Sequence, residues 1–102
     1  MAQSLLEKRL AACVNIIPKM RSLYWWEGEI ESTEEFLLLV KTRLSLTPEV
    51  LTFVKENHPY SVPEIVSLAI QDGNDAYLDW IGANCTFAPK ADESKKIKGE
   101  PQ

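Results

Sequence analysis

The spacing of apolar residues changes several times along this chain of 102 residues, and each change predicts a different element. Leu6 and Leu10 stand four positions apart with three charged residues between them, which predicts a short amphipathic helix over residues 4–10. Residues 13–17 and 20–26 are then rich in β-branched and aromatic side chains, a composition typical of strands.

The two residues Glu27-Gly28 are a turn signal between this stretch and a second one. We therefore predict a long hairpin that pairs residues 14–26 with residues 29–42. Pro18 should mark a bulge or an edge, because proline has no N–H to donate to a ladder.

The return strand is continuously apolar from Phe36 to Val40. Such a run is typical of a strand that is buried on both faces, whereas a half-exposed strand alternates. Helices of the same chain can cover one face, and we expect a second copy of the chain to cover the other.

A second helix is predicted to start at Thr47, with this residue as the N-cap and Pro48 in the first turn. Its apolar face is formed by Val50, Phe53 and Val54, and it must end before Pro59.

The last part of the predicted domain contains one more strand and one more helix. The apolar run at residues 63–70 predicts a third strand, and Asn74 or Asp75 then caps a helix that carries Tyr77, Trp80 and Ile81 on one face. From Asn84 the chain is polar and rich in lysine, so we predict a domain over residues 1–83 and a disordered tail over residues 84–102.

Composition narrows the class of protein. The formal net charge of −4 gives no support for nucleic-acid binding, which needs clustered basic residues. Cys13 and Cys85 have neither metal-site nor disulfide-scaffold spacing, which favours a reduced, cytoplasmic protein. Cys13 is interpreted as a small buried apolar residue, whereas Cys85 is expected at the exposed edge of the tail. We find no signal peptide and no apolar run long enough for a membrane segment.

The predicted order is helix, strand, strand, helix, strand, helix. With one strand in front it becomes β-α-β-β-α-β, the split βαβ or ferredoxin-like plan. The predicted fold class is therefore α+β: a ferredoxin-like antiparallel sheet with helices on one face. We expect it to be truncated at the N-terminus, because residue 1 already lies inside the first helix.

The chain resembles the CutA family of divalent-cation tolerance proteins over roughly residues 5–81, and four segments carry the resemblance. They are Leu10-Ala11-Ala12-Cys13-Val14-Asn15, Ser22-Leu23-Tyr24-Trp25-Trp26-Glu27-Gly28, His58-Pro59-Tyr60 with Pro63-Glu64, and Tyr77-Leu78 with Trp80. The resemblance implies a ferredoxin-like homotrimer in which long hairpins wrap neighbouring subunits. Two departures are the missing first strand and a different end after Ile81.

The resemblance also supplies candidate metal ligands. Copper-binding relatives use a first-strand cysteine, a histidine pair and a glutamate, and here His58 and Glu64 match two of these positions while Asn57 replaces the first histidine. One imidazole and one carboxylate do not complete a copper or zinc site. The structural alternative is that His58 closes the helix end and packs under Tyr60. No cofactor is required, and copper or another divalent cation is the candidate ligand.

Other side chains have two interpretations. Tyr24, Trp25 and Trp26 are either a binding platform or, as we prefer, anchors of a subunit interface. The glutamates near the hairpin turn are interpreted as a solvated tip in preference to a weak cation site: Glu27, Glu29, Glu31, Glu34 and Glu35. The basic residues Lys19, Arg21, Lys41 and Arg43 either line an anion-binding cleft between subunits or form a charged cross-strand rim.

No nucleophile–base pair and no phosphate-binding loop is visible, so we predict a protein that is not an enzyme. The leading hypothesis is a CutA-like homotrimer that acts in divalent metal ion tolerance and binds copper. Two alternatives remain. One is a protein-interaction scaffold of the acetylcholinesterase-anchoring type, as mammalian relatives suggest, with the tail as contact segment. The other is a small-ligand sensor of the PII kind, which rests on fold analogy.

Overall fold

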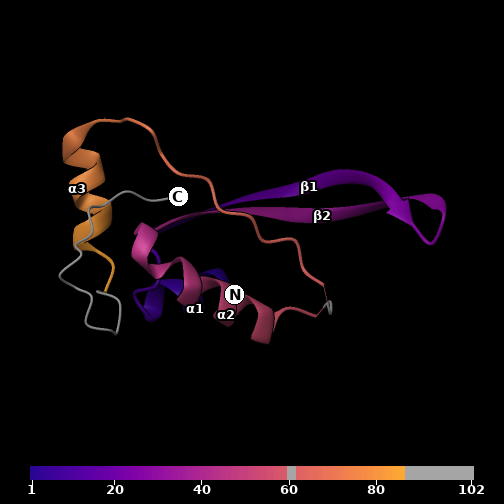
Figure 1. Ribbon diagram of the computed structural model, residues 1–102, viewed down its shortest axis with the longest axis horizontal. Helices are drawn as coiled ribbons and strands as arrows, with labels where there is room; N and C mark the ends of the chain where they lie inside the picture. The colour runs from indigo at the N-terminus through magenta and orange to yellow at the C-terminus, as the bar shows by residue number, and fades with distance from the viewer. Residues whose placement is uncertain (60–61, 87–102) are drawn as a thin grey trace.

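The computed structural model describes residues 1–59 and 62–86 (Figure 1). The predicted packing of His58 under Tyr60 and nearly all of the predicted tail lie outside these residues. The elements are α1 (Ala2–Glu7), β1 (Cys13–Trp26), β2 (Glu29–Lys41), the 3-10 turn η1 (Leu44–Leu46), α2 (Thr47–Asn57) and α3 (Asp75–Ala83).

The hairpin of β1 and β2 is confirmed. The strands pair antiparallel from Cys13 with Lys41 to Trp26 with Glu29. Glu27 and Gly28 both have positive φ angles, 52° and 82°, as a two-residue turn requires when it follows the right-handed twist of the strands. The turn chemistry therefore fixes the register of the whole ladder.

The predicted irregularity at Pro18 is also confirmed. Regular pairing stops at Ile17 opposite Leu37 and resumes at Met20 opposite Glu35. Two residues of β1 therefore face one residue of β2, which is the arrangement of a β-bulge, and Lys19 within it has a φ angle of 58°.

The first helix is shorter at its C-terminal end than predicted. α1 ends at Glu7, and Arg9 adopts a φ angle of 59° that a continuing helix does not allow. The predicted range of residues 4–10 was therefore wrong by two residues at the start and three at the end.

α1 and α2 lie together at the base of the hairpin, as Figure 1 shows, and bury a shared apolar cluster. Its buried members are Leu5, Ala11 and Val50. Apolar residues of α2, of both strands and of the turn after α1 pack around them: Leu10, Val14, Val40, Phe53 and Val54. The apolar face predicted for α2 is thus confirmed.

The N-cap predicted for α2 was wrong. Leu46 occupies the cap position, Thr47 already lies inside the helix, and the Thr47 hydroxyl makes no hydrogen bond within the described part of the chain. The 3-10 turn η1, which precedes α2, was not predicted. With this turn in front of it, α2 begins at Thr47, one residue earlier in the sequence than predicted.

The third strand predicted at residues 63–70 is not present. These residues join no sheet in the described chain, whose ladder contains β1 and β2 alone. An apolar run has strand geometry only when a neighbouring strand accepts and donates its backbone hydrogen bonds, and no described strand takes that place.

α3 begins as predicted, because the Asn74 side chain accepts hydrogen bonds from the N–H groups of Ala76 and Tyr77. Ile81 is buried, whereas Tyr77 and Trp80 are stacked on each other and about half exposed. Cys85, expected at an exposed edge, is instead buried against Leu46 and Ile81, so that expectation was wrong.

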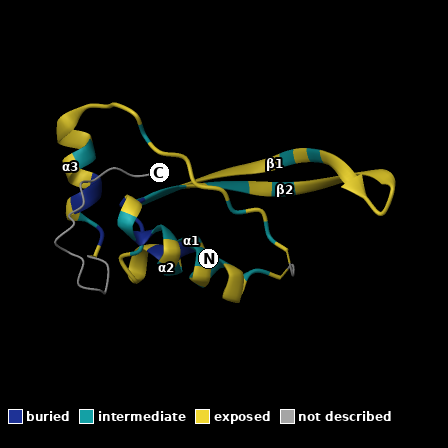
Figure 2. Cartoon of the chain, in the orientation of Figure 1, coloured by how far each residue is buried: buried dark blue, intermediate teal, exposed yellow. Residues whose placement is uncertain are grey.

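Most of the outer half of the hairpin is exposed in this chain (Figure 2). In the apolar run of β2, Leu37, Leu38 and Val40 are half-buried, but Phe36 and Leu39 are exposed. A single copy therefore covers this strand in part, and cover by a second copy stays a prediction.

Candidate functional site

The two candidate metal ligands lie on either side of the connection that follows α2. His58 is the C-terminal cap residue of α2, half-buried and with extended backbone angles. Glu64 lies in the extended segment beyond and is exposed. His58 also makes a further interaction in the structure.

The described residues contain no group of three or more His, Cys, Asp or Glu side chains close enough to share a metal ion. Copper and zinc centres in proteins need three or four such ligands. One copy of the described chain therefore does not fit a resident metal centre, and His58 and Glu64 supply at most a partial ligand set.

The aromatic candidates lie together at the end of the hairpin. Trp25 is opposite Ile30 and is 72% exposed, and its neighbours Tyr24 and Trp26 are exposed as well. Large exposed apolar residues that are contiguous in space usually mark a contact surface. Successive strand residues point to opposite faces, so Leu23, Trp25 and Ile30 lie on one face of the hairpin and Tyr24 and Trp26 on the other. We call these exposed residues of the two faces together the hairpin-end patch.

Two of the four basic candidates, Arg21 and Arg43, have different partners within the chain. Arg21 is on the hairpin opposite Glu34, and its Nε donates to Ser32 Oγ at 3.1 Å. Arg43 is buried, and its Nε donates to Gly82 O at 3.0 Å, at the C-terminal end of α3. Arg21 thus fits the cross-strand rim, while Arg43 holds α3, a role that its sequence neighbours gave no reason to expect.

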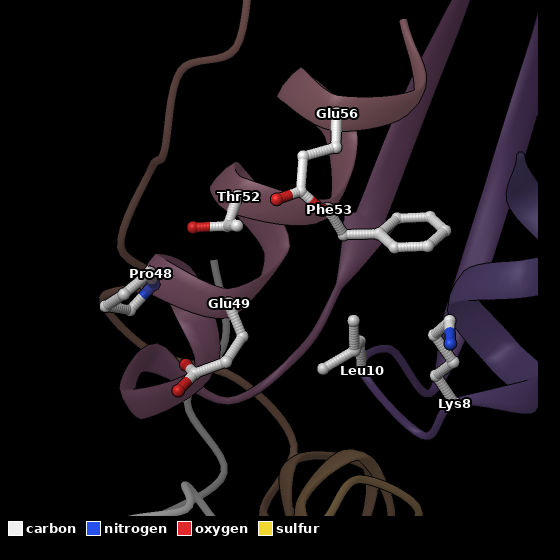
Figure 3. A pocket seen from close by; sticks show the side chains of 7 residues that line it. All are labelled: Lys8, Leu10, Pro48, Glu49, Thr52, Phe53 and Glu56. Atoms are coloured by element: carbon white, nitrogen blue, oxygen red, sulfur yellow. The ribbon is translucent and has the colours of Figure 1, made fainter.

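An open hollow of about 350 Å³ lies between the end of α1 and one face of α2 (Figure 3). It is lined by Lys8, Leu10, Pro48, Glu49, Thr52, Phe53 and Glu56. The Lys8 ammonium lies 5.8 Å from the centre of the Phe53 ring, so this cation is already engaged by an aromatic face.

The carboxylates of the hollow do not make it a metal site. Glu49 and Glu56 are seven residues apart on α2, and no third acidic, histidine or cysteine side chain joins them among the described residues. Glu49 Oε1 has no hydrogen-bond partner there, yet it is shielded from solvent and thus not presented to a ligand.

Comparison with known proteins gives the family. The sequence model described as "CutA1 divalent ion tolerance protein" matches residues 1–84. The divalent-cation tolerance protein CutA of Thermus thermophilus is 53% identical over 83 residues, which is 81% of each chain. The chain belongs to the CutA1 divalent ion tolerance family.

Solved structures agree with this assignment. The structure of the divalent cation tolerance protein from Thermus thermophilus superposes with a TM-score of 0.81 at 52% sequence identity, over 83% of this chain and 82% of that one. The ferredoxin-like fold class is therefore confirmed, since the CutA1 structures have this fold.

Some relatives are considerably longer. The rice protein named CutA 1, chloroplastic, is 48% identical over 81 residues, which is 79% of this chain but 46% of the relative. The chain thus spans about half of such proteins. Within the part of the chain that the structure describes, no helix is long and apolar enough to cross a membrane.

Proposed function

We propose that this member of the CutA1 family acts in tolerance to divalent cations as a homotrimer without catalytic activity. The observation that carries the proposal is the hairpin-end patch, because a single chain leaves this aromatic surface in water. Apolar patches of this kind are covered in stable assemblies, where aromatic residues form the centre of interfaces. Membership of a family of tolerance proteins, which is not a known enzyme family, supports the remainder.

Light scattering coupled to size exclusion tests the assembly. A homotrimer has a mass of about 35 kDa, three times the 11.6 kDa of one chain. A single species of 11.6 kDa at micromolar concentration would contradict the homotrimer, whatever the chain does with metals.

For copper, we propose weak binding in which His58 is the principal ligand and Glu64 an auxiliary one. The incomplete ligand set in one chain argues against a resident centre, so we expect labile binding and no copper that survives dialysis.

Calorimetric titration of Cu²⁺ into the protein and into the His58→Ala variant tests this part. We expect a heat signal that the variant loses, and Glu64→Gln should reduce the apparent affinity without removing the signal. Equal heats for the parent and His58→Ala would show that the histidine binds no copper, and the assembly measurement would be unaffected.

The cytoplasm is our proposed compartment, in keeping with the two cysteines that show no disulfide. The chloroplastic name of the rice relative shows that compartments differ between members of the family. Fractionation of cells that express the natural gene with a C-terminal tag tests the assignment. A tag recovered in an organelle or outside the cell would overturn it.

A further inference from the structure

α3 is held by a small apolar cluster of its own. Leu46, Ile81 and Cys85 are buried together, with Leu10 and Ala12 packed against them. The cluster between α1, α2 and the hairpin has different buried members, and Leu10 is the residue that touches both clusters. Loss of the α3 cluster therefore leaves the other one largely intact.

The segment that leads into α3 adds almost nothing to its attachment. Residues 62–74 join no ladder, and none of residues 62–73 makes a backbone hydrogen bond to another described residue. Val62 is 85% exposed, and Val66 and Leu68 are 73% exposed. A segment with so few buried contacts and paired backbone groups opens at low free energy.

Four sets of polar contacts fasten the C-terminal end of α3. In the first, Arg9 Nη1 donates to Asn84 O at 3.4 Å and to Asn84 Oδ1 at 3.5 Å. Arg43 donates to the Gly82 carbonyl, and the Thr86 N–H donates to the Arg9 carbonyl at 2.9 Å. The fourth contact joins the Cys85 thiol and Thr42 Oγ1 at 3.6 Å. The Thr42 hydroxyl donates its single proton to Leu10 O at 2.6 Å, so the thiol is the donor of this contact. The thiol is therefore buried only while α3 is docked.

We propose that α3 is a detachable latch: α3 and its connection undock as one unit while the hairpin, α1 and α2 stay folded. Undocking exposes the apolar side chain of Leu46 and the thiol of Cys85. A bulky adduct on Cys85 cannot return to the site beside Thr42, so thiol modification holds the latch open. This inference does not rest on the proposed copper binding.

Thiol labelling by iodoacetamide in increasing urea tests the first part. The reporter protein carries Cys13→Ser, so that Cys85 is its one thiol. The matched control carries Cys13→Ser, Cys85→Ala and Ala11→Cys, which places a thiol in the other cluster, where Ala11 is 1% exposed.

We expect Cys85 to react at least about tenfold faster than the control thiol below the unfolding transition. Its rate should depend weakly on urea, because a local opening exposes little surface. Equal rates with the same steep urea dependence would mean that the thiol is reached by global unfolding, and this result would overturn the proposal.

The Arg43→Met variant distinguishes undocking of α3 from a loss of stability of the whole chain. Loss of the contact to Gly82 should accelerate labelling of Cys85 several-fold more than labelling of the control thiol. The same acceleration at both thiols would overturn the proposal, since it would show one cooperative unit.

Amide hydrogen exchange of the alkylated reporter protein tests the second part. We expect α3 amides to lose protection while amides of the β1–β2 ladder keep it. Protection that is retained in α3, or lost in both elements, would overturn the thiol-sensitive latch.

Discussion

Within residues 1–59 and 62–86, three residues other than glycine adopt positive φ angles, and each stands where the chain turns or bends. Arg9 ends α1, Lys19 lies in the β1 bulge, and Glu27 forms the hairpin turn with Gly28. For a residue with a Cβ atom, the left-handed region costs about 1–2 kcal/mol because Cβ approaches the carbonyl oxygen. These positions persist because the packing on either side of them determines the path of the chain.

Gly28 is the position in the turn where a side chain is least acceptable. The Gly28→Ala variant should lose about 1–2 kcal/mol of unfolding free energy, because its φ angle of 82° puts a Cβ atom in the left-handed region. The cost is conformational, since nothing lies within 4 Å of the new Cβ. Urea unfolding followed by circular dichroism measures it.

Gly73→Ala is the matched control. The backbone there is not left-handed, and the added Cβ would meet Leu78 Cδ2 at an ordinary 3.5 Å. We expect this variant to be neutral or stabilised by up to about 1 kcal/mol, because alanine restricts the unfolded chain. Equal losses at Gly28 and Gly73 would contradict the conformational explanation.

At the scale of elements, α3 depends on its first turn. Asn74 Oδ1 accepts from the first-turn N–H groups of Ala76, at 2.9 Å, and of Tyr77, whose N–H also donates to the Asn74 carbonyl at 3.0 Å. Asn74→Ala should lower the unfolding free energy by about 0.5–2 kcal/mol, which is seen as a fall in the melting temperature. Asn57→Ala serves as control, since the Asn57 side chain bonds a carbonyl at the exposed end of α2. A melting temperature that falls by the same amount in both variants would argue against a capping role.

The segment of residues 64–72 should behave unlike a strand in solution. Its amides have no backbone partner among the described residues, so we expect their hydrogen exchange to be close to that of an unstructured peptide. The amides of the β1–β2 ladder serve as the internal reference. Protection of residues 64–72 to a similar degree would show that another strand pairs with them in solution.

This segment also marks the limit of sequence-based prediction for the elements. The hairpin was predictable because Glu27-Gly28 and Pro18 carry local signals. The strand at residues 63–70 was predicted from its apolar side chains alone. Strand formation also depends on a neighbouring strand to pair with, and the residues of the run do not show whether one is present. The end of α1 was missed because an arginine with a positive φ angle carries no turn signal.

At the scale of the whole molecule, the sequence was sufficient to predict the family and the fold, but not the contacts that hold α3 in place. The ferredoxin-like fold was predicted from the order of the elements and the family from four short segments, and both are confirmed. The role of Arg43 was not predictable, because its partner, the Gly82 carbonyl, is 39 residues away along the chain. Burial of Cys85 was missed for the same reason, since Leu46 and Thr42 reach it only in the folded chain.

The proposed homotrimer requires a subunit interface, and we predict that the hairpin-end patch forms it. Trp25→Glu should reduce the trimeric mass toward that of one chain, because a tryptophan at the centre of an interface is commonly worth 2 kcal/mol or more, as an order of magnitude. The folded hairpin should survive, since the cross-strand pair of Trp25 with Ile30 contributes only about 0.2–1 kcal/mol. Light scattering and circular dichroism on the same sample separate the two effects.

Val62→Glu is the control for the position of the introduced charge. Val62 is even more exposed than Trp25, at 85%, but it lies outside the hairpin. If apolar exposure alone drives association, both charges reduce the mass equally. If the interface runs through the hairpin end, only Trp25→Glu does so. A trimer that survives Trp25→Glu would move the interface away from the patch, and the exposed apolar residues of β2, Phe36 and Leu39, would then be the surface to test.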